Sequence, residues 1–513
     1  MTFGKLSWKA GIAMLLLAAA LLVGGCGSSD DSTADENLKL TGDAWPGVDL
    51  AGTRSVDSPI NGKNVKDLEE VWRLPLKAQS SFGAMASTPV IANGAVYLQD
   101  LESNVQVVSL ESGEVQWTYK ANEPTLGPNG VVVADGMVFG ATSSEAFALD
   151  QETGKELWKT PLSDGPDSGI DMAPGYHDGL VYVSTVPTNP TAQYPAGIVG
   201  TLYALDAETG KVKWEWESVP KDLWGDPKTN SGGGLWYPPS FDGKGFMYFG
   251  TGNPAPFPGT PKDPWGSSRP GPNLYTNSLV KMNAKTGKME WYYQQTPHDI
   301  YDWDFQNTPI LTKIDGRDVA IGSGKSGYVV AADAKTGNVI WKKPLGIHNG
   351  HDQDPLYAMR GEYEKLKTEE EVLPGYLGGI IAPIAANETA VFVPVVNHAG
   401  GVSKSQERIE GQENFGIMVS IDKKTGQVNW YESYEEAPFG APTVTNDLVF
   451  FVTSGGILRA LDIATGELKW EQKLPAGANS GVAISGDTVV APAGLPSPTG
   501  ENPSVVAYRL PGQ

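Results

Sequence analysis

Apolar and polar residues alternate in short runs along most of the chain, and the same run followed by a turn returns many times. Runs such as "VVSL", "TLYAL" and "GILRAL" have the two-residue period of a β-strand with one buried face. Each run leads into a phrase close to Asp-x-x-Thr-Gly, which suits a tight turn because Asp and Thr bond nearby backbone and Gly tolerates positive φ. A second strand carrying a tryptophan follows, so each copy predicts a β-hairpin. Seven copies are intact, and their tryptophans are Trp117, Trp158, Trp214, Trp291, Trp341, Trp430 and Trp470.

The repeat predicts an all-β propeller. Two further strands precede the hairpins, as in "STPVIANGAVYLQD" and "APTVTNDLVFFVT". Four antiparallel strands make one propeller blade, and self-similarity over about 40 residues is typical of propellers and solenoids. Another tryptophan, Trp72 in "DLEEVWRLPL", precedes the first unit, whereas the last unit ends without one. We therefore expect eight four-stranded antiparallel blades, with the N-terminal strand closing the ring as the outer strand of the last blade.

The spacing of the tryptophans is uneven. Two gaps are much longer than the others: Trp214–Trp291 spans 77 residues and Trp341–Trp430 spans 89, against 40 for Trp430–Trp470. Long insertions on a repeating scaffold usually fall on one face and carry function. The stretch "HDIYDWDF" opens the blade between the two insertions and places Asp299, Asp302 and Asp304 among three aromatic residues. These acids are the strongest candidates for chemistry.

Composition supports the β assignment and limits the partners. The 513 residues include 62 glycines and 38 prolines, both unfavourable inside helices, and the 40% of hydrophobic residues can form a core. The formal net charge of −22 makes nucleic acid an unfavourable partner, because its phosphates would repel the protein.

The first residues predict export. Lys5 and Lys9 precede an apolar run that is short for a membrane span and ends in "VGGC", which resembles the lipobox of bacterial lipoproteins. The resemblance implies cleavage before Cys26 and a lipid on that cysteine; an ordinary signal peptide with an unmodified cysteine is the alternative. We expect an extracytoplasmic protein, lipid-anchored to the cell membrane. The expected parts are a signal peptide (1–25), a tether and lead-in (26–58) and a single propeller (59–513).

The repeated phrase, "GTGNPAP" and "TPHDIYDWD" together resemble the quinoprotein alcohol and methanol dehydrogenases. Those are eight-bladed propellers that hold pyrroloquinoline quinone (PQQ) and a metal ion on the axis. The resemblance implies that Asp302 is the catalytic base and that the metal, calcium or a lanthanide ion, is bound by Asn253, Asp302 and Asp304. It also implies that Trp236 stacks on the quinone, that Lys325 hydrogen-bonds the quinone carbonyls, and that Asn397 contacts the cofactor.

Several family positions differ. The family has a metal-ligating glutamate near the position of Pro195, where this sequence has no acid. Asn129 occupies the position of the family's arginine that reaches the PQQ carboxylates. An early glutamate is replaced within "FGAMASTP", and the vicinal cysteine pair is absent because Cys26 is the only cysteine. No CxxCH motif is present, so the resemblance implies a separate electron acceptor rather than a haem in this chain.

The residue types fit alcohol oxidation. Hydride transfer to a quinone needs a base for the hydroxyl proton, a hard cation on oxygen ligands and a flat apolar floor. Two carboxylates about 6 Å apart repel by roughly 3 kcal/mol at an effective dielectric near 20, so Asp302 and Asp304 favour a cation between them inside a propeller. The alternative places both acids in solvent at the mouth of a loop, with Tyr301 and Trp303 packing between blades.

The sequence is therefore consistent with two functions. The first is a membrane-tethered, PQQ- and metal-dependent dehydrogenase that oxidises an alcohol or sugar and passes electrons to a separate acceptor. The second is a non-catalytic propeller lipoprotein, a protein-interaction scaffold similar to the outer-membrane assembly propeller. His348 and His351 in "HNGH" are a weaker metal candidate, because a polar turn also explains them.

Overall fold

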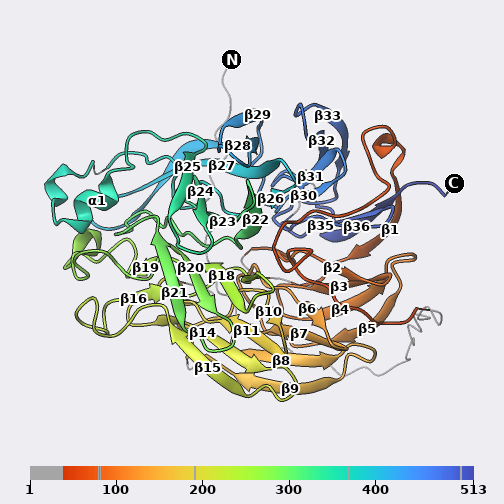
Figure 1. Cartoon of the computed structure of the whole chain (residues 1–513), viewed down its shortest axis with the longest axis horizontal. Helices are drawn as coiled ribbons and strands as arrows, with labels where there is room; N and C mark the ends of the chain where they lie inside the picture. Colours follow the sequence, from red (N-terminus) through yellow and green to blue (C-terminus); the bar gives the residue numbers. More distant parts are fainter. Residues whose placement is uncertain are drawn as a thin grey trace, which may run out of the picture. The chain divides into compact units, whose positions relative to one another are not determined.

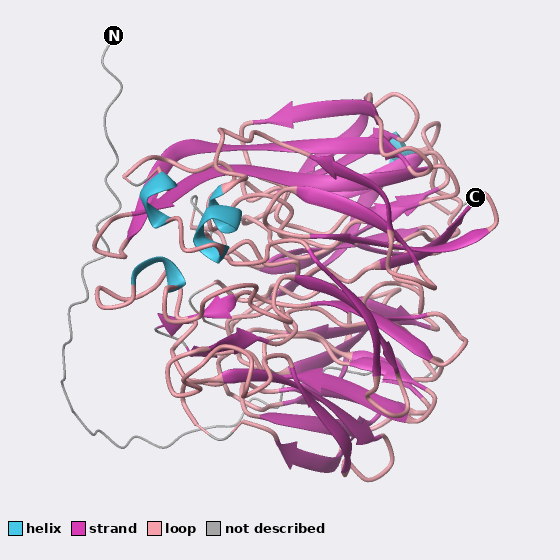
Figure 2. Ribbon diagram, turned by 60° about the vertical axis from the view of Figure 1, so that its left-hand side comes forward, coloured by secondary structure: helices cyan, strands magenta, loops and turns pink. Residues whose placement is uncertain are grey.

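The seven repeated hairpins form the outer halves of seven sheets in the computed structural model, which describes residues 38–512 except for Gln79, Ser81, Asp164, 190–191, Thr368 and 497–499. These residues belong to one unit of the chain, Ala34–Gln513. Strands predominate and the helices are short (Figure 2). The helices are η1 (Val65–Asp67), η2 (Pro264–Gly266), α1 (Asp354–Met359) and η3 (Tyr363–Lys365). In this part of the chain no helix is long and apolar enough to cross a membrane.

Seven sheets have four antiparallel strands each, and the eighth unit lies in a six-stranded sheet. The first sheet is β2–β5 (Val90–Ala92, Ala95–Gln99, Val105–Ser109, Val115–Tyr119), and the second is β6–β9 (Val132–Ala134, Met137–Ala141, Glu145–Asp150, Glu156–Pro161). The third unit is β10, β11, β14 and β15 (Gly175–His177, Leu180–Ser184, Val199–Asp206, Val212–Glu217). Its sheet also includes β16 (Ser231–Gly233) and β19 (Pro254–Ala255). A short pair, β12 (Thr188–Asn189) and β13 (Ala192–Gln193), lies in the same region.

The second half repeats the arrangement, and Figure 1 shows its sheets following one another. They are β17, β18, β20, β21 (Ser240–Phe241, Phe246–Gly250, Ser278–Asn283, Met289–Gln294), β22–β25 (Ile310–Ile314, Arg317–Ser323, Tyr328–Asp333, Val339–Pro344), β26–β29 (Ala385–Ala386, Ala390–Val402, Arg408–Asp422, Val428–Tyr434) and β30–β33 (Thr443–Thr445, Leu448–Val452, Ile457–Asp462, Leu468–Lys473). The last sheet has the order β1-β36-β35-β34 (Glu69–Pro75, Ser504–Arg509, Thr488–Ala493, Ala483–Ser485). The eight four-stranded units agree with the predicted blades.

The ring closes as predicted. Strand β1, from the N-terminal side, is the outer strand of the last sheet, and Trp72 on it is the register partner of Ala507. First strands of neighbouring sheets contact one another, including β2 with β6, β6 with β10, and β2 with β34. The last sheet therefore meets the first, and the first strands converge.

The repeated tryptophans join each blade to the next. The ring nitrogen of Trp158 donates a 2.8 Å hydrogen bond to the carbonyl of Ala207 in the following blade. Gly210, in the turn of that blade, has φ +69°, and a Cβ atom there would lie 2.6 Å from the Trp158 ring. The phrase therefore needs its glycine both for the turn and for the close approach of tryptophan. The motif therefore serves the packing of the blades.

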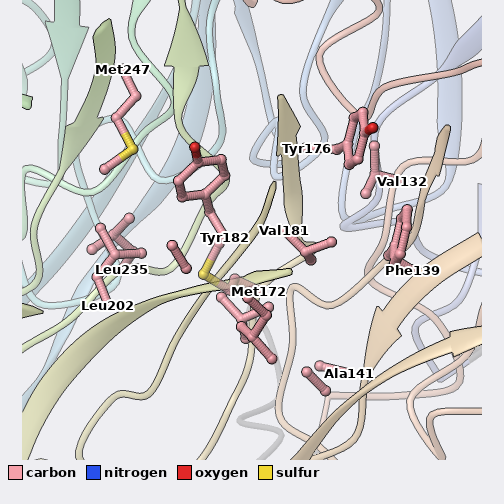
Figure 3. Close-up of a cluster of buried hydrophobic side chains, with 14 of the residues drawn as sticks. Val132, Phe139, Ala141, Met172, Tyr176, Val181, Tyr182, Leu202, Leu235 and Met247 are labelled. Atoms are coloured by element: carbon pink, nitrogen blue, oxygen red, sulfur yellow. The ribbon is translucent and has the colours of Figure 1, made fainter. Parts of the chain in front are cut away.

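Between the blades the core is apolar. Figure 3 shows one buried cluster at the second, third and fourth sheets. Phe139 and Tyr176 stack there with ring centroids 5.5 Å apart, and Met172 and Met247 are fully buried. Such interdigitated packing fixes the angle between neighbouring sheets.

The lead-in part of the predicted segment 26–58 runs across the first strands. Between Ala44 and Val56 its backbone hydrogen-bonds to five sheets, through Val133, Phe241, Leu311, Ala386 and Val444. It thus lies where the blades converge. The domain limits proposed from the sequence stay predictions, and the signal peptide and Cys26 lie outside the described residues.

Candidate functional site

The loop before β22 is shaped by Asp299. Its carboxylate accepts hydrogen bonds from the backbone N–H of Tyr301 at 2.8 Å and of Trp303 at 2.6 Å, and from Asn277 Nδ2 at 2.9 Å. Burial raises the pKa of Asp299 to about 6, although these hydrogen bonds oppose the shift. Asp299 is therefore a structural acid, and the loop that it holds gives Asp302 a positive φ of 63°.

Asp302 and Asp304 meet at one lysine. Lys325 Nζ lies 3.1 Å from Asp302 Oδ1 and 2.9 Å from Asp304 Oδ2, and both carboxylates are almost completely buried. One ammonium against two carboxylates leaves an excess of one negative charge. The alternative of solvated acids at a loop mouth is therefore wrong, because neither side chain is exposed.

Burial and neighbouring charges determine the protonation of this cluster. Burial raises the pKa of Asp302 well above its ordinary value, and Asp304 adds to the shift while Lys325 opposes it. Burial alone would lower the pKa of Lys325, but the two carboxylates outweigh burial and raise it, so the lysine stays charged. Asp302 is thus a stronger proton acceptor than an ordinary aspartate.

Asn253 approaches the same acids. Its backbone N–H donates a short hydrogen bond to Asp304 Oδ1. Its side chain is completely buried, yet Oδ1 and Nδ2 have no hydrogen-bond partner among the described residues. A buried amide without partners is costly, so this site is built for a further ligand.

Tyr194 completes the cluster. Its hydroxyl donates a 3.1 Å hydrogen bond to Asp304 Oδ2, and its backbone has a positive φ of 59°. Burial raises the pKa of Tyr194 well above its ordinary value, and the Asp302 and Asp304 charges add to this. The phenol is therefore neutral, and it brings a hydroxyl rather than a charge to the acids.

A cavity of about 310 Å³ adjoins this cluster. A volume of this size is at the lower end of the range for small-molecule sites, about 300–1,000 Å³. Asp304 and Lys325 form part of its wall, whereas Asp302 is not one of the described lining residues. The other lining residues are largely apolar and include Phe82, Leu126, Tyr194, Trp236, Tyr237, Gln306, Leu377, Ile381, Phe439 and Leu495.

Comparison with known proteins identifies the relatives of this chain. The family model for the glucose/ethanol/alcohol dehydrogenase β-propeller domain matches residues 169–342, which contain the whole cluster. The quinohemoprotein alcohol dehydrogenase of Comamonas testosteroni is 29% identical over 503 residues, covering 83% of this chain and 68% of the relative. This chain is a relative of the quinoprotein alcohol dehydrogenases. The crystal structure of the same Comamonas protein has a TM-score of 0.78 and 25% identity, covering 92% of this chain and 81% of that one.

A second family model matches segments that do not contain the acidic cluster. The model for the outer membrane protein assembly factor BamB matches residues 64–172 and 385–508, which flank the alcohol-dehydrogenase match. The crystal structure of BamB from Moraxella catarrhalis has a TM-score of 0.53 at 15% identity, covering 86% of this chain and 99% of that one. At that identity the likeness concerns the propeller fold alone.

Most of the residues predicted from the likeness to quinoprotein dehydrogenases converge, but one does not. Asn253, Asp302, Asp304 and Lys325 form the cluster, and Trp236 lines the cavity beside it with its ring nitrogen buried and unpaired within the described structure. Asn397 lies instead in β27, where its Oδ1 accepts a 2.8 Å hydrogen bond from the Ile347 N–H, and the cavity lining does not include it. Their individual roles stay predictions.

Two other sequence candidates have local partners. His348 Nδ1 is 2.7 Å from Asp352 Oδ1, and His351 Nδ1 is 2.8 Å from Asp354 Oδ2. This agrees with a polar loop rather than a metal site. Among the described residues, no group of three or more His, Cys, Asp or Glu side chains is arranged to hold a metal.

Sequence reasoning missed Tyr194. It sought an acid near Pro195, where the family has a glutamate, and Tyr194 is the immediate neighbour of that proline. A phenol is not recognisable as a replacement ligand from the sequence. Only its hydrogen bond to Asp304 reveals the connection.

The residues fit both groups that quinoprotein relatives imply. Asn253 Oδ1 and the Asp302 and Asp304 carboxylates are hard oxygen donors, and the excess negative charge and the unpaired Asn253 amide favour a cation. Trp236 offers a flat face, and the Lys325 ammonium offers a donor for a carbonyl oxygen. The fit to a planar carbonyl compound beside a cation is therefore good, with Tyr194 as the atypical member.

Proposed function

We propose that this protein is a PQQ- and metal-dependent dehydrogenase that oxidises an alcohol or a sugar outside the cytoplasm. The observation that carries the proposal is the convergence of two buried acids, a largely buried lysine and an unpaired asparagine amide in one cluster, of which Asp304 and Lys325 line a cavity. A propeller that only binds other proteins has no need to bury such a cluster. The resemblance to quinoprotein dehydrogenases supplies the reaction class.

Each side chain has a role in the proposal. Asn253, Asp302 and Asp304 hold a calcium or lanthanide ion, and Trp236 stacks on PQQ. PQQ, when bound, accepts the hydride of the substrate. Asp302 accepts the hydroxyl proton, for which its raised pKa suits it. Lys325 keeps both carboxylates in place and donates to a cofactor oxygen.

The experiment is reconstitution. Purified protein is mixed with PQQ and either Ca²⁺ or La³⁺, and cofactor absorbance and dye-linked oxidation of alcohols and sugars are recorded. We expect retained cofactor absorbance and metal-dependent dye reduction. Absence of both with each metal would overturn the proposal.

The location is also proposed. "VGGC" supports lipidation of Cys26 and attachment to the membrane, with electrons passing to a separate acceptor protein. Cys26→Ser should move the protein from the membrane fraction to the soluble fraction of cells. A variant that stays in the membrane fraction would argue against the lipid anchor.

A protein-interaction scaffold is the second candidate function. The match of residues 64–172 and 385–508 to the BamB model supports it, since those segments surround the cavity region without including the acids. Purification with stably bound partner proteins, together with failed reconstitution, would favour it.

A further inference from the structure

A second buried cation lies beyond the site described above. Arg54, in the lead-in segment, is only 3% exposed. Its Nε donates to the Pro442 carbonyl at 2.7 Å, and Nη1 donates to the Pro46 carbonyl at 2.8 Å. Its Nη2 donates to Thr443 Oγ1 at 3.2 Å and to the Val482 carbonyl at 3.4 Å. All these partners are neutral.

The charge of Arg54 is therefore not balanced. No carboxylate of the described residues forms an ion pair with it, unlike Lys325 with its two acids. Burial lowers the pKa of Arg54 to about 10, so the guanidinium is still protonated at neutral pH. A buried, unpaired charge is costly unless an opposite charge reaches it.

Arg54 lines a small cavity next to the large one. It lines a cavity of about 40 Å³, which is large enough for ordered water. Five lining residues are common to this small cavity and the large one, namely Ala86, Pro128, Tyr237, Phe439 and Asn479. The two cavities are therefore adjacent and share part of their walls.

Tyr237 connects the two cations electrostatically. Burial raises the pKa of its hydroxyl, and both Lys325 and Arg54 oppose the shift. Both positive charges therefore act on the same wall. The acids accompany only Lys325, so the charge of Arg54, in the adjoining small cavity, has no carboxylate partner among the described residues.

Asn479 belongs to the wall that the two cavities share. It lines both cavities, and its buried Oδ1 has no hydrogen-bond partner in the described part of the chain. An amide can turn to present its N–H₂ group to an anion. Arg54 and Asn479 thus define a polar floor at which no carboxylate of the described residues balances the charge of Arg54.

We propose that the floor formed by Arg54 and Asn479 recognises an anionic group of the cavity's guest, such as a carboxylate, and holds that group away from Asp302 and Asp304. With PQQ as guest this proposal rests on the proposed function. Arg54 then supplies the positive charge that quinoprotein dehydrogenases have at the position of Asn129, where they carry an arginine. Asn129 itself donates to the Asp100 carbonyl and lines the small cavity.

The test compares charged and neutral guests of the same shape. The first pair is PQQ and its trimethyl ester. The second pair, which is independent of PQQ, is 8-anilinonaphthalene-1-sulfonate and N-phenyl-1-naphthylamine. Dissociation constants are measured by fluorescence for the wild-type protein, and we expect the anionic member of each pair to bind about tenfold more tightly.

Two substitutions at Asn479 isolate the charge. Asn479→Asp places a carboxylate at the floor while leaving every hydrogen bond of Arg54 in place, and it should remove the anion preference without weakening the neutral probe. Asn479→Leu adds no charge and should retain most of the preference. Arg54→Met should remove the preference, and Arg54→Lys should retain it.

Each outcome decides the matter. If folded Asn479→Asp and Arg54→Met proteins keep the wild-type ratio, Arg54 only binds carbonyls and the inference is overturned. It is also overturned if the wild-type protein prefers no anionic probe. If PQQ fails to bind but the naphthalene pair shows a preference that depends on Arg54, the anionic floor stands and the cofactor proposed for it does not.

Discussion

Lys325 Nζ lies 2.9 Å from Asp304 Oδ2, inside the propeller and at the wall of its largest apolar cavity among those described. The same ammonium also lies 3.1 Å from Asp302 Oδ1. One flexible side chain therefore balances two acids that are close in sequence. Stability and chemistry at this site depend on the same contact.

Lys325→Met should destabilise the protein by about 3 kcal/mol at pH 7, because it leaves two buried carboxylates without their cation. Burial already raises the pKa of Asp302, and loss of the lysine raises it further. An acid whose pKa is raised in the folded state binds a proton more readily there than in the unfolded chain. The loss of unfolding free energy in Lys325→Met should therefore shrink as pH falls toward 5. Urea unfolding at pH 7 and pH 5 measures both values. Lys325→Arg, which keeps the charge, is the matched control, and an equal deficit at both pH values would contradict this account.

Asp302→Asn should lower kcat of the reconstituted enzyme by at least about 100-fold, since it removes the proposed proton acceptor. The fold should survive, because the amide keeps the shape of the side chain and removes a buried charge. Thermal unfolding and dye-linked turnover are the two measurements. Asp304→Asn is the comparison, since Asp304 and not Asp302 lines the cavity. If Asp302→Asn keeps wild-type turnover, Asp302 is not the base.

The propeller was predictable from the sequence because its signals are local. The Asp-x-x-Thr-Gly turn, the alternating strands and the tryptophan each report short-range geometry, so the blades and the closing strand β1 followed directly. The cluster of Asn253, Asp302 and Lys325 was predictable only through resemblance. Tyr194 and Arg54 were not predictable, since the first depends on a contact between distant blades and the second on the path of a lead-in segment that resembled a linker.

His298, beside the acidic loop, makes the stability depend on pH. Both of its ring nitrogens lie 3.0 Å from backbone carbonyls, of Gly271 and Trp265. Burial lowers its pKa to about 4, and nearby Arg269 contributes to the shift. The neutral ring is favoured in the folded state, so the unfolded chain takes up a proton first as pH falls below about 6.5.

Protonation of His298 should therefore lower the free energy of unfolding of the wild-type protein by about 2 kcal/mol between pH 7.5 and pH 5. A His298→Asn variant should lack that loss, although it is less stable at pH 7.5 because carbonyl partners are lost. Urea unfolding of both proteins at the two pH values gives the difference. Parallel losses in the two proteins would show that His298 does not titrate in this way.

Tyr194→Glu should convert the site into a stronger binder of trivalent ions. Tyr194 brings a neutral hydroxyl to Asp304, so the wild-type cluster has two carboxylates against the charge of Lys325. A glutamate at this position adds a third carboxylate and a charged oxygen ligand, which hard trivalent cations prefer. Tb³⁺ luminescence, sensitised by the nearby Trp236, measures affinity without turnover, and we expect at least about a tenfold gain. Tyr194→Gln, which adds a neutral ligand of similar length, should give little gain. Equal affinities in the glutamate and glutamine variants would mean that residue 194 does not reach the ion.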